Sequence, residues 1–239
     1  MTIFVSHFPT PALNMPDFDE VYGKTLPFDD QGLVRALEYI AFPRREFKIV
    51  KELNSNILEV ESNEYRTSYP IYVDRRFGVI QKEPQKKVRL KMPSREVILE
   101  RMLSKKGLPY VWGGNWSSGL VEWEEKYPCP KSLESGQKHH WNFRGLDCSG
   151  LLYEATEGLI PRNTKELMKY GVEIPINKIQ ALDFIVYPGH VLIAINEQEV
   201  IESSHQLGGV VVSPLKKRLV EIRTPLRIRR FFQTPQDTA

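Results

Sequence analysis

Cysteine is scarce in this chain, which has only Cys129 and Cys148 among its 239 residues. Two cysteines cannot form the disulfide framework of a small secreted domain, and no Cys/His cluster has the short spacing of a zinc site, so no metal is expected. The excess of one charge over the other is also small, because 30 acidic residues offset 33 basic ones and leave a net charge of +3. A dedicated nucleic-acid binder needs a more basic surface, so nucleic acid is not an expected partner.

Long apolar runs are missing as well. No stretch approaches the roughly 18 residues of a membrane-spanning helix. Residues 1–14 have no lysine or arginine before their first apolar run, which His7, Pro9 and Pro11 interrupt. This is unlike a cleavable export signal. We therefore expect a cytoplasmic protein without an integral membrane segment, with export by a route other than Sec as the alternative.

The composition that remains is that of a folded globular protein, with 41% hydrophobic and 26% charged residues. The length suits one large domain or two of unequal size. Residues 81–95 are polar and basic and contain two prolines, which is typical of a linker or an exposed strand at a boundary. We therefore expect an N-terminal domain over 1–93 and a second domain over 94–239.

The first domain has the pattern of a small β-rich fold. Three short β-favouring segments, at 47–51, 57–61 and 69–73, are separated by polar turn clusters. One helix is expected around 30–39.

The second domain has helices first and strands after. Helix starts are indicated by Ser94, Asp147 and Asn163, all residue types that cap helices, and Asn163 has Glu166 in capping-box spacing. Apolar strands then follow at 183–187, 191–195, 199–203 and 210–212. Helices followed by antiparallel strands are typical of an α+β fold.

Two residues of this second domain have reactive side chains in suggestive places. Cys148 lies in the first turn of a predicted helix, where the helix dipole and free N–H groups favour a thiolate and an oxyanion. His190 begins an apolar strand directly after Pro188 and Gly189, where it can serve as a general base. Taken singly, each residue also fits a purely structural role, because most free cysteines are small buried hydrophobes and most single histidines are surface or core residues.

The flanking residues, read together, are more specific. Residues 107–114 (GLPYVWGG), 146–151 (LDCSGL) and 189–195 (GHVLIAI) occur in this order and resemble the NlpC-type cysteine peptidases, which hydrolyse peptidoglycan stem peptides. The resemblance covers about residues 97–215. It implies a papain-like catalytic domain that needs no cofactor, with peptidoglycan stem peptides or muropeptides as the substrate. Related two-domain peptidases carry an SH3-like domain before it, which the β-rich segment permits.

The resemblance also implies roles for individual residues. Cys148 matches the nucleophile and His190 the base. Tyr110 matches a tyrosine that hydrogen-bonds near the cysteine. Asp147 and Ser149 match positions that contact the L-Ala amine of the substrate in members that trim free stem peptides.

The third catalytic position departs from the family pattern. The family places His, Asn or Gln twelve residues after the base, and here that residue is Glu202. A carboxylate is able to orient the imidazole. His205 is the rival, because a symmetrical hairpin centred on residues 197–198 sets His205 opposite His190 and turns Glu202 to the other face. Family spacing favours Glu202.

Residues 115–145 form a long insertion between two of the matching blocks. It contains three tryptophans, which either pack against the N-terminal domain or line a binding cleft. Its Cys129, His139 and His140 lack further partners for a metal. Near the C-terminus, basic and apolar residues alternate over 216–230, which we interpret as a solvated strand face.

The sequence therefore predicts a cysteine endopeptidase that cleaves the bond between γ-D-glutamate and diaminopimelate in stem peptides, for recycling or for wall remodelling. Two other classes stay open. One is a catalytically silent wall-binding module, for which the change to Glu202 is the best support. The other is a Cys/His acyltransferase, because the same fold type supports transfer to acceptors other than water. The sequence carries no signal for an oligomeric state.

Overall fold

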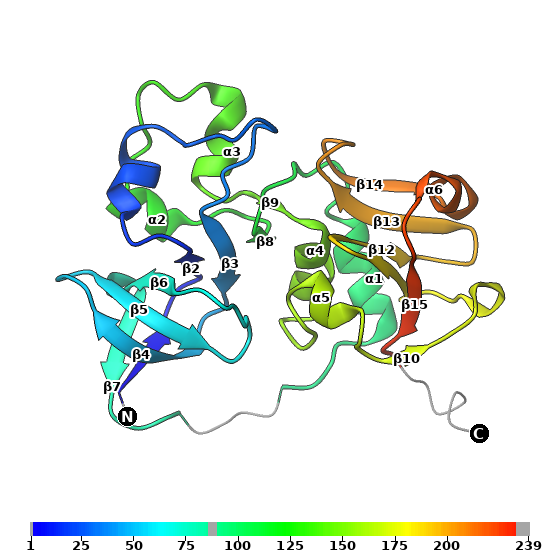
Figure 1. The fold of residues 1–239 in the computed structure, drawn as a ribbon, viewed down its shortest axis with the longest axis horizontal. Helices are drawn as coiled ribbons and strands as arrows, with labels where there is room; N and C mark the ends of the chain where they lie inside the picture. The colour runs from blue at the N-terminus through cyan, green and yellow to red at the C-terminus, as the bar shows by residue number, and fades with distance from the viewer. Residues whose placement is uncertain (1, 86–89, 233–239) are drawn as a thin grey trace. The chain divides into compact units, whose positions relative to one another are not determined.

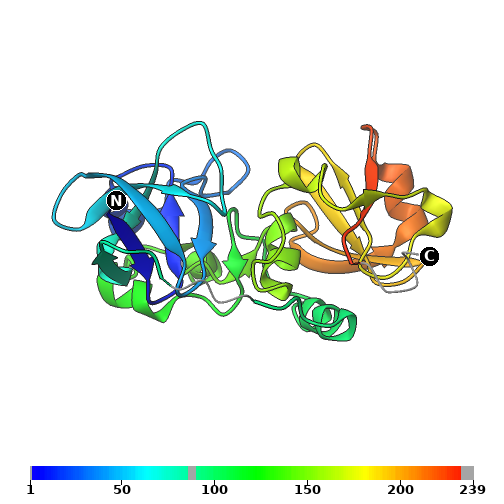
Figure 2. The same cartoon turned by 90° about the horizontal axis from the view of Figure 1, so that it is seen from below.

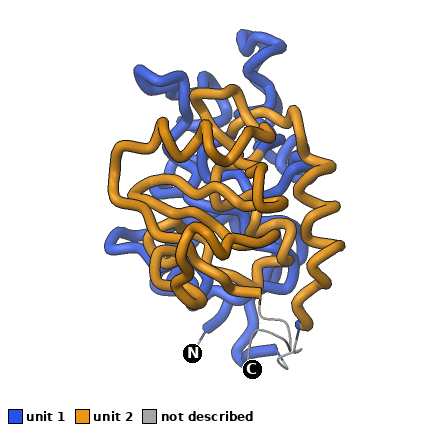
Figure 3. The backbone as a smooth tube through the Cα atoms, turned by 90° about the vertical axis from the view of Figure 1, so that its right-hand side faces the viewer, with its two compact units in different colours: residues 1–90, 111–145 blue, residues 91–110, 146–239 orange. Residues whose placement is uncertain are grey.

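A computed structural model of the chain describes residues 2–85 and 90–232. The chain forms two compact units (Figure 3): unit 1 comprises Met1–Leu90 and Val111–Gly145, and unit 2 comprises Lys91–Tyr110 and Leu146–Ala239. The change at residue 90 lies close to the boundary expected from the sequence. The insertion, however, belongs to unit 1, so the division is not the simple one into 1–93 and 94–239. Part of the predicted linker, residues 86–89, lies outside the described residues.

Unit 1 is built on an antiparallel sheet of seven strands in the order β3-β2-β6-β5-β4-β1-β7. Figure 1 labels most of these strands, and Figure 2 shows the same ribbon from below. The strand predictions at 47–51, 57–61 and 69–73 correspond to β4, β5 and β6. The strands and helices of this unit are β1 Ile3–Ser6, β2 Thr10–Leu13, β3 Leu37–Ala41, β4 Glu46–Glu52, β5 Ile57–Ser62, β6 Ile71–Asp74, β7 Gly78–Gln81, β8 Asn115–Trp116, α2 Val121–Lys126 and α3 Lys138–Trp141, with helical turns at Asp19–Lys24, Arg75–Phe77 and Ser135–Gln137.

The predicted helix at 30–39 is wrong. Asp29 accepts backbone hydrogen bonds from Gln31 and Leu33, and Gly32 has a φ of 72°, so this stretch is a turn. The residues after it form strand β3, and every one of them is buried. Strand β3, buried along its whole length in the sheet, thus takes the place of the later part of the expected helix.

The insertion is held in unit 1 by aromatic packing. Trp123 is buried and lies 5.1 Å, ring centroid to centroid, from Tyr22 in an edge contact. Phe143 makes a similar contact with Tyr22 at 5.0 Å, and Trp141 belongs to the same core. Of the two interpretations of the tryptophans, packing on the N-terminal segment is the one that the structure supports for Trp123 and Trp141.

Unit 2 has a sheet in the order β10-β15-β11-β12-β13-β14, with all neighbouring strands antiparallel. Helix α4 packs against α1 and against β12 and β13, whereas α6 packs against β14 (Figure 1). Its elements are α1 Arg95–Leu103, α4 Cys148–Ala155, α5 Thr164–Leu167, α6 Leu215–Glu221, β10 Val172–Glu173, β11 Phe184–Tyr187, β12 His190–Ala194, β13 Glu199–Ser204, β14 Gly209–Pro214 and β15 Arg227–Arg230, with a turn at Ile176–Lys178; β9, Gly145–Leu146, spans the unit boundary. Helix and sheet are thus mixed as the α+β expectation requires.

The three predicted helix starts are confirmed. The side chains of Ser94, Asp147 and Asn163 each accept a hydrogen bond from a backbone N–H in the first turn of α1, α4 and α5. These caps satisfy N–H groups that have no partner inside the helix. The one that matters for the site is Asp147, because the next residue is Cys148.

The prediction of a strand over the whole of 216–230 is wrong in its first part. Residues Leu215–Glu221 form helix α6, and the strand β15 begins only at Arg227. Leu215 is buried in a core cluster with Leu192 of the sheet, and Leu219 packs against the same cluster. Burial at positions i and i+4 gives the segment the apolar stripe of a helix.

Candidate active site

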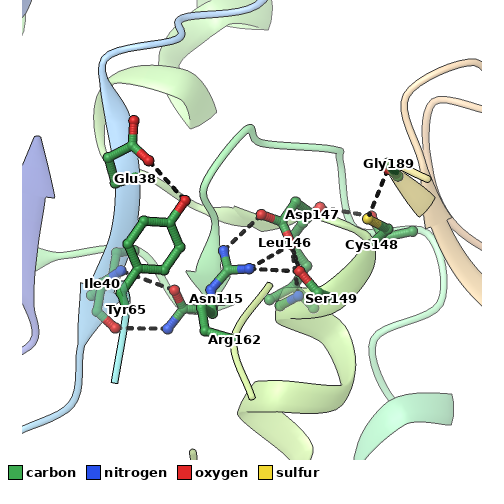
Figure 4. Close-up of polar contacts among 12 residues, drawn as sticks. Glu38, Ile40, Tyr65, Asn115, Leu146, Asp147, Cys148, Ser149, Arg162 and Gly189 are labelled. Carbon is green, nitrogen blue, oxygen red and sulfur yellow. Dashed lines mark hydrogen bonds and ion pairs between the residues drawn. The ribbon is translucent and has the colours of Figure 1, made fainter. Parts of the chain in front are cut away.

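Cys148 is the first residue of α4. Asp147 caps the helix, accepting at 2.6 Å from the backbone N–H of Gly150, and this fixes the thiol at the positive end of the helix. The cysteine is 6% exposed. Its Sγ lies 3.8 Å from the carbonyl oxygen of Gly189, the residue before His190 (Figure 4). The cysteine and histidine singled out from the sequence therefore lie side by side in unit 2.

The imidazole of His190 binds the carboxylate of Glu202 through its Nε2 atom. Its Nε2 lies 2.7 Å from Oε2 of Glu202, a carboxylate with no solvent exposure. This contact occupies Nε2 and leaves Nδ1 for the thiol of Cys148. A histidine whose far nitrogen is bound by a carboxylate has a fixed ring orientation, which general-base catalysis requires.

Strand register decides between Glu202 and His205. Ile193 pairs with Ile201, and Ala194 pairs with Val200, so the hairpin is centred on Glu197 alone. The symmetrical hairpin expected from the sequence is centred half a residue later. Because side chains alternate along a strand, that half-residue difference puts Glu202, and not His205, on the face of His190.

The hairpin turn sets this register. The side chain of Asn196 accepts hydrogen bonds from the backbone N–H groups of Gln198 and Glu199, and Ile195 N–H bonds the carbonyl of Glu199. Each residue of β12 therefore pairs with a β13 residue one position earlier than it would in the symmetrical hairpin. His205 lies beyond β13, exposed, with its ring 5.6 Å from that of Tyr110.

Arg218 of α6 contacts this site, and the sequence analysis did not identify it as a site residue. Its Nε lies 2.5 Å from Oε1 of Glu202 and its Nη2 lies 3.0 Å from Oε2, so the guanidinium grips both oxygens. The remaining Nη1 bonds Glu221 one helical turn along. The signal was present: Leu215 and Leu219 at helical spacing place Arg218 on the buried face of a helix.

Charge at the site follows from these contacts. Burial lowers the pKa of His190, but hydrogen bonds and charge from Cys148 and Glu202 outweigh it and raise that pKa to about 9. Burial raises the pKa of Glu202, and the bonds from His190 and Arg218 outweigh it and hold that pKa below its usual value. At neutral pH the site therefore holds a charged imidazolium next to a charged carboxylate, and an imidazolium favours a thiolate beside it.

Asp147 and Ser149, predicted to bind substrate, lie in a buried network around Arg162. The guanidinium of Arg162 is 2.6 Å and 3.0 Å from the two oxygens of Asp147 and 2.8 Å from Oγ of Ser149 (Figure 4). Arg162 is 2% exposed, and its sequence position gave no hint of this role. A buried ion pair with this geometry fixes the start of α4.

The remaining candidates are spread more widely. Tyr110, the predicted neighbour of the cysteine, forms an isolated bridge with Leu146, two residues before Cys148. His139 and His140 lie on α3 in unit 1, whereas Cys148 and His190 belong to unit 2. Among the described residues, no three His, Cys, Asp or Glu side chains are grouped so as to hold a metal ion. Nor does any described helix have the length and apolar character to cross a membrane.

A cysteine at a helix N-terminus, a histidine at the start of a neighbouring strand and a carboxylate bound to that histidine form the arrangement that papain-type cysteine hydrolases use. The NlpC/P60 family model matches residues 107–229, just over half of the chain. The chain belongs to this family, and the resemblance expected from the sequence is confirmed.

Individual relatives agree with this assignment. The peptidoglycan endopeptidase RipB of Mycobacterium tuberculosis is 33% identical over 129 residues, which are 51% of this chain and 48% of RipB. The chain thus spans about half the length of this curated relative. The solved structure of RipB aligns with a TM-score of 0.45 and 28% identity over 59% of this chain and 65% of that one.

Two further solved structures are similar. The M. tuberculosis protein RipD, described as a non-catalytic NlpC/p60 domain protein, aligns at 23% identity over 58% of this chain and 97% of that one, with a TM-score of 0.41. An NlpC/P60 family protein from Bacillus cereus aligns at 16% identity over 97% of this chain and 64% of that one, also with a TM-score of 0.41.

Proposed function

We propose that the protein is a cysteine endopeptidase that hydrolyses the bond between γ-D-glutamate and diaminopimelate in peptidoglycan stem peptides. The observation that carries the proposal is the contact between Nε2 of His190 and Glu202, which leaves the other ring nitrogen for Cys148 at the start of α4. Membership of a peptidoglycan-hydrolase family and the likeness to an endopeptidase support it.

In this mechanism the Sγ of Cys148 attacks the γ-carbonyl carbon of D-glutamate, which forms the amide bond to the diamino acid. The oxygen becomes an anion, which the backbone N–H groups and the dipole at the start of α4 stabilise. The imidazolium of His190 donates a proton to the amine of the diamino acid, and that amine leaves. A thioester with Cys148 remains.

Water then completes the reaction. His190, now neutral, takes a proton from a water molecule that attacks the thioester carbonyl, and the sulfur leaves as a thiolate beside the restored imidazolium. Throughout these steps Glu202 holds the ring and stabilises its charged form. Glu202 thus takes the place of the His, Asn or Gln expected from the family, which argues against a silent site.

Other parts of the proposal concern substrate recognition. Asp147 and Ser149 are proposed to contact the L-Ala amine of the stem peptide, as the family resemblance implies, and Tyr110 is proposed as a third substrate-binding residue close to the cysteine. The β-rich unit 1 is proposed to be the counterpart of the SH3-like domain of the two-domain relatives. Action in the cytoplasm would make the substrate an imported free peptide.

The test uses the tripeptide L-Ala-γ-D-Glu-diaminopimelate and intact sacculus fragments, with mass spectrometry of the products. Cys148→Ala is the inactive variant, and Cys129→Ala is the matched control, because these are the two cysteines of the chain. We expect L-Ala-γ-D-Glu to be released by the unmutated protein and by Cys129→Ala, with no product from Cys148→Ala. Residual turnover by Cys148→Ala near the unmutated rate would overturn the mechanism.

The choice of substrate separates the remaining alternatives. Preference for the free tripeptide supports recycling, and preference for sacculus fragments supports wall remodelling. Binding to sacculus without cleavage of either substrate would replace the proposal with a wall-binding module. Transfer of the acyl group to an added amine in preference to water would make the protein an acyltransferase.

A further inference from the structure

The carboxylate at the third catalytic position creates a physical demand that a neutral Asn or Gln does not. Glu202 has no solvent exposure, and a buried carboxylate is costly unless cations and hydrogen bonds compensate it. His190 alone does not compensate the charge of Glu202 at every step, because a general base is charged in one part of each turnover and neutral in another. A permanent cation is therefore needed at Glu202 when the imidazole is neutral.

Arg218 meets this demand with suitable geometry. Its side chain is 13% exposed, and its Nε and Nη2 reach separate oxygens of Glu202. A guanidinium stays charged at all relevant pH values and presents its donors in a fixed fork. The second of these bonds is to Oε2, the oxygen that also faces His190 Nε2. The fork thereby fixes the direction of that oxygen.

Packing explains why α6 delivers the guanidinium to this place. His190, Leu192 and Ala194 alternate onto one face of β12, and Leu192 and Ala194 share a core cluster with Leu215 of α6. The helix therefore covers the same face of the sheet that carries the imidazole. Arg218, one turn after Leu215, faces that sheet as well.

We infer that Arg218 is a positioning residue of the active site, which holds Glu202 charged and aimed at His190 throughout the catalytic cycle. This inference rests on the proposed function for its meaning in catalysis. The site then consists of Cys148, His190, Glu202 and Arg218 in a row, and α6 is part of the catalytic apparatus.

Several other groups near Glu202 bear on its charge. Tyr187 of β11 is the neighbour of His190 across the sheet, with ring centroids 5.5 Å apart, and its hydroxyl is in reach of Arg218. Glu221 shares the guanidinium from α6. Among the cations at the site, Arg218 is the one whose charge stays constant. Its loss should therefore allow Glu202 to take up a proton at a higher pH.

The test does not require a substrate. The rate of alkylation of Cys148 by iodoacetamide is measured against pH in a Cys129→Ala background, for Arg218→Met, for Arg218→Lys and for Lys217→Met. We expect Arg218→Met to slow alkylation about tenfold at pH 6 and less than twofold at pH 9, in line with the loss of an outer-shell partner. Lys217, the adjacent exposed cation on α6, is the matched control and should leave both rates unchanged. Arg218→Lys keeps the charge without the fork and should recover part of the rate.

A double variant shows whether Arg218 acts through Glu202. In a Glu202→Gln background, Arg218→Met should change the pH 6 rate less than twofold, because there is no carboxylate left to hold. An equal slowing in both backgrounds would overturn the inference, as would an unchanged pH profile in Arg218→Met. If Arg218→Met does not fold, Arg218→Lys and the double variant, which leaves no unpaired buried charge, carry the test.

Hydrolysis of the tripeptide provides the second readout. Arg218→Met should lower kcat about tenfold to a hundredfold with KM within about twofold, because the residue does not touch substrate. Absence of hydrolysis by the unmutated protein would count against the proposed function alone, since the alkylation profiles would still decide the role of Arg218. A fall in thermal stability with normal profiles would assign Arg218 a structural role and overturn the inference.

Discussion

Two buried carboxylate–guanidinium pairs flank the reactive residues of unit 2, and they differ in which partner is hidden. In the pair next to Cys148, the cation Arg162 is 2% exposed and the anion Asp147 is 12% exposed. In the pair behind His190, the anion Glu202 is not exposed and the cation Arg218 is 13% exposed. The first pair fixes a helix end, whereas the second acts on a titrating ring. We infer that the first serves mainly the stability of unit 2 and the second mainly its chemistry.

The largest expected effect is on the first pair. Asp147→Ala leaves Arg162 buried without its carboxylate and removes the cap of α4, so we expect unit 2 to lose about 3–5 kcal/mol of unfolding free energy. Asp147→Asn, which retains a capping oxygen, should lose less. At neutral pH Arg218→Met should lose less than half as much as Asp147→Ala, because the ring of His190 is charged there and stays a partner of Glu202.

The measurement must report on unit 2. All four tryptophans lie in unit 1, so tryptophan fluorescence follows the other unit. Hydrogen exchange of peptides from α4 and β12, read by mass spectrometry, gives the free energy of opening in unit 2. Equal losses from Asp147→Ala and Arg218→Met would remove the distinction between the two pairs.

The next effect concerns the second pair and the register of its hairpin. Glu202→Ala should reduce kcat about a hundredfold, because the imidazole loses its orientation and the partner of its charged form. His205→Ala should change kcat less than threefold, since His205 lies exposed beyond the end of β13 and Glu202 is the residue that binds His190. Steady-state hydrolysis of the tripeptide measures both. Equal mild losses would mean that neither residue orients His190.

This comparison of Glu202 with His205 also shows where sequence reasoning ends. The strands on both sides of the hairpin were predicted from their apolar pattern, and β12 and β13 confirm them. The face that each residue occupies depended on a shift of half a residue in the turn. That shift comes from the side chain of Asn196 closing the loop, which periodicity does not reveal.

The cations of both pairs were missed for a different reason. Cys148, Asp147 and His190 stand in short motifs, so local spacing identified them. Arg162 and Arg218 lie 15 and 16 residues from their carboxylates and meet them only in the fold. For Arg218 the basic neighbours at 216–217 suggested a solvated surface, and the helical burial of Leu215 and Leu219 was overlooked.

A smaller effect is expected on the titration of His190. Cys148→Ala removes one of the two partners that raise the pKa of His190 to about 9, and we expect that pKa to fall by about one unit while Glu202 still holds it up. NMR titration of the imidazole measures the shift. Asp147→Asn, which alters the pair of Asp147 with Arg162, is the control and should leave the pKa of His190 unchanged.

The same titration has a consequence for stability. The pKa of His190 is about 6.5 in an unfolded chain and is raised in the folded one, so the charged ring stabilises the fold below about pH 6.5. That contribution is lost as the pH rises toward 9. Unit 2 of His190→Gln should therefore lose less stability between pH 6.5 and 9 than the unmutated unit. An identical pH dependence would contradict the raised pKa.

The smallest effect is expected from Glu221, the second carboxylate on Arg218. This pair joins residues three apart on α6, and the Glu221 side chain is 44% exposed, so solvent screens it and its contribution is a few tenths of a kcal/mol. Glu221→Gln should therefore change kcat less than twofold, because Nε and Nη2 of Arg218 still grip Glu202. A loss as large as that of Arg218→Met would mean that Glu221, and not the packing of α6, aims the guanidinium. The functional unit behind His190 would then extend to the exposed face of the helix, and the contrast between a buried chemical pair and its solvated neighbour would disappear.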